Sequence, residues 1–201
     1  MANANKPMGL SPHSYISGAR WSGAGTMYVS LASNTNALAI GDPVVLGGSA
    51  DAAGVPNVVL ATAGAANTIT GVVVGIGSAN VYGGATGASV QFTSVLVPAS
   101  SPANVYILVA DDPMLLFEVQ EGGAGTALAA ADLGTNINLL SGANNGYVSG
   151  WQIDNNSKGT GVTLQCKLLR LMQRADNTFG AQAKWVVSIN NHTFSSGTTG
   201  Y

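Results

Sequence analysis

The sequence predicts an all-β fold built from many short strands, and three observations lead to this prediction. The strong helix formers Glu, Lys, Arg and Gln are scarce, whereas Gly, Asn, Thr, Ser and Val are abundant. Short apolar or alternating runs recur along the chain. Each of them is bounded by Gly, Asn, Pro or Asp, the residues that form turns. Short strands at this spacing are typical of a β-sandwich or a β-barrel.

The first element is an extended N-terminal arm over residues 1–20. This segment has no periodic pattern, and Pro7 and Pro12 forbid a helix and favour an extended path. It carries more apolar side chains than a freely solvated tail would have, which indicates that it docks. It can dock onto another protein or across its own domain, and the sequence leaves both interpretations open. The apolar side chains are Met8, Leu10, Tyr15 and Ile16.

A β-rich body follows over residues 21–192, with a soft boundary at the linker-like segment 98–103. The expected strands are residues 26–31, 44–46, 55–60, 69–75, 90–97, 105–110, 115–120, 147–153, 162–174 and 184–192. One short helix is expected over residues 127–133, capped by Thr126 and ended by Gly134. The Ser/Thr/Gly-rich residues 193–201 are expected to form a flexible tail.

The strand expected over residues 162–174 changes phase in its middle. Apolar residues alternate with polar ones up to Leu168, but Leu169 and Leu171 then fall on the polar face and Arg170 on the apolar one. A β-bulge near Leu168 would restore the alternation, and an interface covering both faces would also explain it. The next strand keeps its register, so the intervening residues 175–180 predict a long hairpin connection.

Charge is the most informative part of the composition. Only 8% of the residues are charged and the net charge is −2, against roughly 25% charged residues in an average soluble domain. So few cations argue against free nucleic acid and anionic membranes as partners. The charge-free run from Ala52 to Ala110 is divided by Gly, Asn and Pro into stretches far shorter than the ~20 residues of a spanning helix. An uncharged surface instead suits permanent contact with protein subunits.

No catalytic or cofactor motif is present, so we expect a protein that is not an enzyme and has no cofactor or metal. Cys166 lies on an apolar strand face and is interpreted as a core residue; a dyad with His13 or His192 is the remote alternative. Asp111 and Asp112 precede Pro113, which favours a turn over a cation site. The N-terminus lacks the pattern of a signal peptide.

Opposite charges gather in different parts of the chain. Intramolecular ion pairs are the preferred interpretation, and pairs between subunits are the alternative. The acidic group is Asp111, Asp112, Glu118, Glu121 and Asp132, and the basic group is Lys158, Lys167, Arg170, Arg174 and Lys184.

Several stretches together resemble the capsid cement, or head-decoration, proteins of tailed bacteriophages. These stretches are AIGDPVVL (39–46), ATAG (61–64), ITGVVVG (69–75), LVADDP (108–113), FEVQ (117–120), LLRL (168–171) and KWVVSIN (184–190). The resemblance implies a β-barrel, jelly-roll or β-tulip-like body. It also implies a non-enzymatic virion protein on the capsid exterior that is made in the host bacterial cytoplasm, binds the phage major capsid protein and locks neighbouring subunits together.

The resemblance further implies a symmetric homo-oligomer, for which we expect a trimer, with a dimer as the alternative. The residues expected to contact the capsid or a neighbouring subunit are Lys6, Pro7, Met8, Leu10, Tyr15, Arg20 and Trp21.

A carbohydrate-binding or adhesin-like β-sandwich on a phage or bacterial surface is the alternative function. It would need aromatic side chains exposed together as a sugar platform. The aromatics available for it are Trp21, Tyr82, Tyr147 and Trp151.

Overall fold

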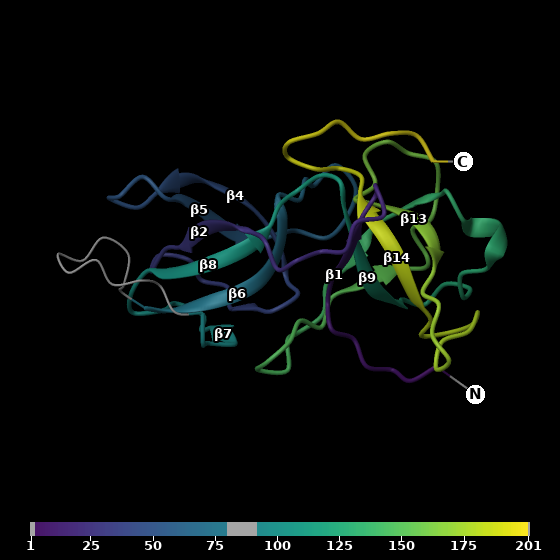
Figure 1. Ribbon diagram of the computed structural model, residues 1–201, viewed down its shortest axis with the longest axis horizontal. Helices are drawn as coiled ribbons and strands as arrows, with labels where there is room; N and C mark the ends of the chain where they lie inside the picture. Colours follow the sequence, from purple (N-terminus) through teal and green to yellow (C-terminus); the bar gives the residue numbers. More distant parts are fainter. Residues whose placement is uncertain (1–2, 80–91, 201) are drawn as a thin grey trace.

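The computed structural model describes residues 3–79 and 92–200, and this part of the chain is almost entirely β-structure (Figure 1). The all-β prediction is therefore confirmed. Helical structure within the described residues is confined to one 3₁₀ helix, η1 (Ala130–Asp132). The strands are β1 (Ser11–Tyr15), β2 (Thr26–Ser30), β3 (Leu38–Ala39), β4 (Pro43–Ala50), β5 (Pro56–Leu60), β6 (Gly71–Ala79), β7 (Leu96–Val97), β8 (Val105–Ala110), β9 (Leu115–Gly122), β10 (Asn136–Ile137), β11 (Leu139–Leu140), β12 (Gln152–Asp154), β13 (Cys166–Leu171) and β14 (Lys184–Ile189).

Five strands close into a barrel in the order β2-β5-β4-β6-β8, with β8 paired back to β2 (Figure 1). The β2–β5 pair is parallel and the other neighbouring pairs are antiparallel. Val44, Val73 and Ile107 belong to the buried cluster that these strands share. A barrel this small is filled by its own side chains, so it provides a packed body rather than a channel.

The second sheet has the strand order β10-β13-β14-β9-β12-β11, and β1 also pairs with β9. β14 is antiparallel to both β9 and β13, whereas β12 is parallel to β9. All eight residues of β9 are buried, as expected for a strand with partners on both sides. β9 is therefore the strand against which the N-terminal segment and the C-terminal half of the chain assemble.

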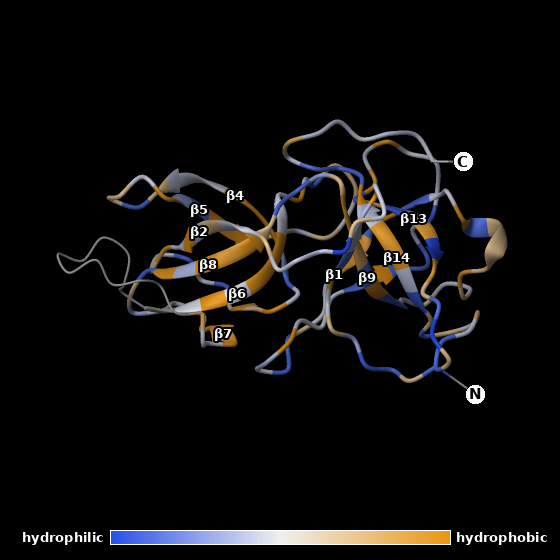
Figure 2. Ribbon diagram, viewed as in Figure 1, coloured by the Kyte–Doolittle hydropathy of each residue, from blue (hydrophilic) through white to orange (hydrophobic). Residues whose placement is uncertain are grey.

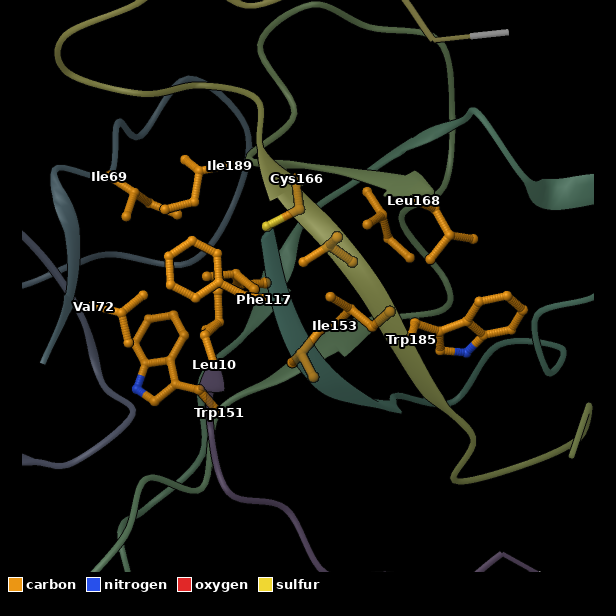
Figure 3. Packing of buried hydrophobic residues seen from close by; sticks show 14 of the residues in the cluster. Leu10, Ile69, Val72, Phe117, Trp151, Ile153, Cys166, Leu168, Trp185 and Ile189 are labelled. Carbon is orange, nitrogen blue, oxygen red and sulfur yellow. The ribbon is translucent and has the colours of Figure 1, made fainter. Parts of the chain in front are cut away.

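The core of the second sheet continues into the wall of the barrel. Ile69 and Val72, from the barrel half, belong to the same buried cluster as Phe117, Trp151 and Trp185 (Figure 3). Strand β6 explains this continuity, because successive side chains of a strand point to opposite faces. Val72 packs in the cluster of the second sheet and its neighbour Val73 packs inside the barrel.

A strand that is buried on both faces is apolar at successive positions, with no polar alternation. The apolar colouring of β6 and β8 in Figure 2 follows from this burial. The same burial accounts for the Val-rich part of the charge-free run seen in the sequence.

The expected β-bulge is confirmed. β13 and β14 pair with a register shift, because Leu168 lies opposite Val187 while Arg170 lies opposite Val186. Leu169 is the extra residue of the bulge. The shift leaves Arg170 exposed and returns Leu171 to the core, which is the correction that the broken alternation required.

The N-terminal segment is not shown as a projecting arm. Residues 11–15 form β1, which pairs antiparallel with β9, and Leu10 is fully buried in the core beneath. The side chain of Gln120 accepts a hydrogen bond from the backbone N–H of Lys6 and donates one to Asn5. Of the two interpretations left open, docking across its own domain is the one observed for residues 3–15.

The expected elements otherwise match the observed strands in type and differ in length. The helix expected over residues 127–133 is reduced to η1, where the carboxylate of Asp132 accepts the backbone N–H of Ala129 at 2.8 Å. The strand expected over residues 147–153 begins only at Gln152, and that over 162–174 is confined to β13. Of the strand expected over 90–97, residues 90–91 lie outside the described residues and Leu96–Val97 form β7.

Segment 98–103 connects β7 to β8. The chain passes between the barrel and the second sheet through residues 16–25, between β1 and β2, and through the turn between β8 and β9. Residues 193–200 lie against the body. The amide of Asn190 accepts the backbone N–H of Thr198 at 2.9 Å, and the ammonium group of Lys167 donates to the hydroxyl of Thr198 at 2.8 Å. The backbone N–H of Gly200 donates to the carbonyl of Thr160 at 3.1 Å.

Candidate functional site

A hollow of about 850 Å³ opens beside β1, and we call it the basic hollow because two arginines lie in its wall. Its lining comes from β1, from the loop that follows β1, and from β9 and β13 of the second sheet. The lining residues are His13, Ser14, Tyr15, Ile16, Gly18, Arg20, Trp21, Leu116, Leu169 and Arg170.

A tight turn after β1 places Arg20 in this wall. The backbone N–H of Tyr15 donates to Ala19 at 2.8 Å, and that of Gly18 donates to Tyr15 at 2.9 Å. Gly18 has a φ of 89°, a left-handed conformation that glycine adopts without steric cost. The turn sends the chain back along β1, where Arg20 forms a single antiparallel bridge with Ser14.

A β-bulge shapes the lining on each side of the hollow. On β1 the register with β9 shifts between Pro12 and Ser14, which leaves His13 as the extra residue. On β13 the extra residue is Leu169, beside Arg170. Bulges redirect side chains that regular alternation would place elsewhere, and both of these turn residues toward the same hollow.

A second, mostly apolar groove of about 260 Å³ lies next to β1, toward the barrel. Trp21 lines both the groove and the basic hollow, so the two are adjacent. The residues of this apolar groove are Met8, Leu10, Ser11, Pro12, Trp21, Ile40, Gly41, Val73, Val74 and Val148.

Two exposed apolar residues adjoin each other here: Ile16, which lines the basic hollow, and Met114, its backbone hydrogen-bond partner. Ile16 is 63% exposed and Met114 is 54% exposed, and the backbone N–H of Ile16 donates to the carbonyl of Met114 at 2.9 Å. We refer to the basic hollow, the apolar groove and these two residues together as the β1 flank. Arg, Trp, Tyr and Met are the residue types enriched where proteins bind one another.

The residues that the sequence singled out for an interface divide into two groups. Met8, Tyr15, Arg20 and Trp21 line the basic hollow or the apolar groove. Leu10 reaches the floor of the groove but is fully buried, so the expectation that it inserts into a partner is wrong. Its burial follows from β1 pairing with β9, which the sequence did not indicate.

Lys6 and Pro7 line neither of the two depressions. Lys6 is exposed and its backbone is held by Gln120, and Pro7 is half-buried beside it. The sequence reasoning also missed His13, Met114, Leu169 and Arg170 as part of this surface, whereas it had named Ile16 among the apolar side chains of a docking segment. For Leu169 and Arg170 a signal was present, since the broken alternation of β13 already marked the bulge.

The aromatics proposed as a sugar platform do not share one environment. Trp151 is 3% exposed and belongs to the core, so it cannot present a face to a sugar. Tyr147 is 68% exposed, Trp21 is half-buried, and Tyr82 lies outside the described residues.

Cys166 is a core residue, as expected. Its side chain is fully buried in the cluster shown in Figure 3, and burial raises the pKa of its thiol to about 12. His192 is also buried. Burial lowers its pKa, and its Nδ1 accepts the backbone N–H of Phe194 at 3.0 Å.

Asp112 has the turn-forming role that was expected, whereas Asp111 is bound by side chains of β2. The carboxylate of Asp112 accepts the backbone N–H of Met114 at 2.8 Å, and that of Asp111 accepts the hydroxyls of Thr26 and Tyr28. Within residues 3–79 and 92–200, no group of three or more His, Cys, Asp or Glu side chains is arranged to hold a metal ion.

Among the residues that the structure describes, opposite charges pair within the chain, in line with the preferred interpretation. Lys158 binds Asp132 at 2.9 Å, and Arg174 binds Glu118 at 2.8 Å and Asp176 at 2.9 Å.

The part of the chain that the structure describes contains no helix of the length and apolarity needed to cross a membrane. No protein-family model, no curated protein and no solved structure matches the chain.

Proposed function

We propose that this protein is a structural virion protein that binds the outer surface of an icosahedral phage capsid and cements neighbouring major capsid subunits. The observation that supports the proposal best is the β1 flank. There the basic hollow, the apolar groove and the exposed Ile16 and Met114 adjoin on one side of the body. This combination of arginine, aromatic and exposed apolar side chains is the composition of a protein-binding surface.

The construction of the flank also suits a cementing role. β1 is fixed by its pairing with β9, and the turn at Gly18 fixes the loop that carries Arg20 and Trp21. A surface that is ordered before binding loses little conformational entropy when it binds. The low charge of the chain also favours binding, because the free energy of desolvation is small for an interface with few charged groups.

The proposal includes a homo-oligomer, with a trimer expected, because threefold and quasi-threefold positions of an icosahedral shell favour threefold binders. Native mass spectrometry of the free protein and of protein released from capsids measures the subunit number. A trimer in either state supports this part of the proposal, and a monomer in both states contradicts it.

Capsid binding is tested with capsids that lack this protein, prepared from the phage that encodes the chain. We expect the purified protein to co-sediment with these capsids and to add density to their outer surface in electron cryo-microscopy. Ile16→Asp and Met114→Asp should each weaken binding by roughly tenfold or more, because a carboxylate would be desolvated at an apolar contact.

Val95→Asp is the matched control. Val95 is 43% exposed, lies just before β7, which pairs with β3 outside the barrel, and lines neither the basic hollow nor the apolar groove. It should leave binding unchanged. The proposed function is wrong if the wild-type protein neither co-sediments with the capsids nor adds density to them.

A further inference from the structure

Two of the three arginines of this chain have no acidic partner among the described residues. Arg174 binds Glu118 and Asp176, whereas Arg20 and Arg170 form no ion pair there. Both line the basic hollow, together with His13, and no carboxylate lines it. In a chain with seven Lys and Arg residues against nine Asp and Glu residues, two arginines without a counter-ion in one hollow are an uncompensated positive site.

The acidic side chains of the protein are all engaged elsewhere. Each of the nine accepts at least one hydrogen bond from another residue of its own chain, and none of them lines the hollow. They are Asp42, Asp51, Asp111, Asp112, Glu118, Glu121, Asp132, Asp154 and Asp176.

Both arginines are held in the hollow by backbone geometry. Arg20 is placed by its bridge to Ser14, and Arg170 follows the bulge of β13, which turns it out of the core. A guanidinium group presents a planar set of N–H donors that matches the two oxygens of a carboxylate. Ile16, in the lining, and Met114, whose carbonyl accepts the backbone N–H of Ile16, add exposed apolar surface to the same flank.

We propose that the basic hollow binds an acidic side chain of a partner protein. Its carboxylate lies between Arg20 and Arg170, and an apolar residue next to it in the partner packs on Ile16 and Met114. This inference rests on the proposed function, because it names the chemical group of the capsid subunit that the β1 flank binds.

A protein carboxylate fits the hollow better than a nucleic acid does. Binding to a nucleic acid backbone relies on a row of cations that neutralises several phosphates, and the hollow offers two arginines and one histidine. A phosphate backbone would leave the apolar side chains of Ile16 and Met114 exposed to solvent. A peptide with an apolar residue beside its acidic residue covers both the arginines and these apolar side chains.

The direct test uses a pair of short peptides and nuclear magnetic resonance. Acetylated and amidated Leu-Glu is titrated into the full chain and the side-chain Nε–H signals of the three arginines are followed, with Leu-Gln as the uncharged match. We expect Leu-Glu to shift the signals of Arg20 and Arg170 and to leave that of Arg174 in place. Leu-Gln should shift none. In each single variant, Arg20→Gln and Arg170→Gln, the signal of the arginine that remains should shift much less than in wild type.

The second test measures capsid binding by Arg20→Gln/Arg170→Gln. Its control is Lys158→Gln/Lys184→Gln, which removes the same charge outside the hollow. We expect the arginine variant to bind roughly tenfold or more weakly than wild type, and the lysine variant to bind as wild type does. Circular dichroism and the midpoint of thermal unfolding confirm that both variants are folded.

The outcomes separate this inference from the proposed function. The carboxylate site is wrong if Leu-Glu and Leu-Gln act alike, if inorganic phosphate shifts the two arginine signals at a lower concentration than Leu-Glu does, or if the arginine variant binds capsids as tightly as wild type. If wild-type protein does not bind capsids while Leu-Glu still shifts Arg20 and Arg170, the capsid function is wrong and the carboxylate site stands.

Discussion

Glu121 shows how a single buried carboxyl couples the stability of the chain to pH. It lies at the end of β9, where one of its oxygens accepts the indole N–H of Trp185 at 2.8 Å and the backbone N–H of Leu128 at 3.3 Å. Burial outweighs these two hydrogen bonds and raises the pKa of Glu121 above its ordinary value of 4.5. The ionised form is therefore disfavoured in the folded state.

We predict that Glu121→Gln stabilises the protein at neutral pH and not at acidic pH. Because the folded pKa is raised, the unfolded chain loses this proton first as the pH rises above about 4.5, so stability falls until the folded pKa is passed. Gln resembles the protonated form at every pH. The difference in unfolding free energy should be near zero at pH 4 and about 1 kcal/mol in favour of the variant at pH 7.

Urea unfolding followed by tryptophan fluorescence measures this difference at both pH values. Asp176→Asn is the control of opposite sign. Arg174 lowers the pKa of Asp176 to about 2, so the ionised carboxylate stabilises the folded state and this variant should lose stability at pH 7. An equal effect of Glu121→Gln at pH 4 and pH 7 would contradict the prediction.

At the scale of elements, β1 belongs to the folded body and its removal should be costly. A chain that begins at Gly18 lacks both the strand paired with β9 and the fully buried side chain of Leu10. Loss of a buried leucine alone destabilises a protein by about 2–5 kcal/mol. We predict that this truncation lowers the midpoint of thermal unfolding sharply or prevents folding.

A chain that begins at Lys6 is the matched control, because it keeps β1, Leu10 and the bond from Lys6 to Gln120. Differential scanning calorimetry should place its unfolding close to that of the full chain. Equal stability of the two truncated chains would show that β1 is a separable arm.

The β13 bulge gives a second prediction at this scale. Deleting Leu169 leaves Leu168 opposite Val187, Arg170 opposite Val186 and Leu171 opposite Trp185, which is a regular ladder without the extra residue. The deletion should therefore leave a folded protein in which the lining of the basic hollow is reduced, so its response to the Leu-Glu peptide weakens.

Deleting Val187 from β14 tests the reason for this tolerance. β14 has no extra residue, so the loss of one residue there moves part of the strand to the wrong face of the sheet. Circular dichroism should show a folded protein for the first deletion and an unfolded one for the second. Comparable loss of structure in both would contradict the assignment of Leu169 as the dispensable residue.

For the whole molecule, the shared core predicts that barrel and second sheet unfold together. Val72 packs with Phe117 and Trp151 of the second sheet, while its neighbour Val73 packs inside the barrel. We predict that Val72→Ala and Val73→Ala each cost about 2 kcal/mol and shift a single unfolding transition.

Hydrogen exchange measures this at the amides of β4, in the barrel, and of β13, in the second sheet. Both variants should accelerate exchange at both strands to the same extent. Faster exchange in β4 alone for Val73→Ala would show that the barrel opens independently of the second sheet.

Local composition and alternation determined most of the strand-forming segments, though not β1, β3, β10 and β11. The broken period at Leu168 determined the bulge, because it too is a property of neighbouring residues. The tertiary structure decided two further matters. It made residues 11–15 a strand despite Pro12, because β1 pairs with the edge of β9 and the neighbouring Leu10 is buried in the core. It also brought Arg20 and Arg170 from opposite ends of the chain into one hollow. Strand pairing over long sequence separations created that site, and no local pattern records such pairing.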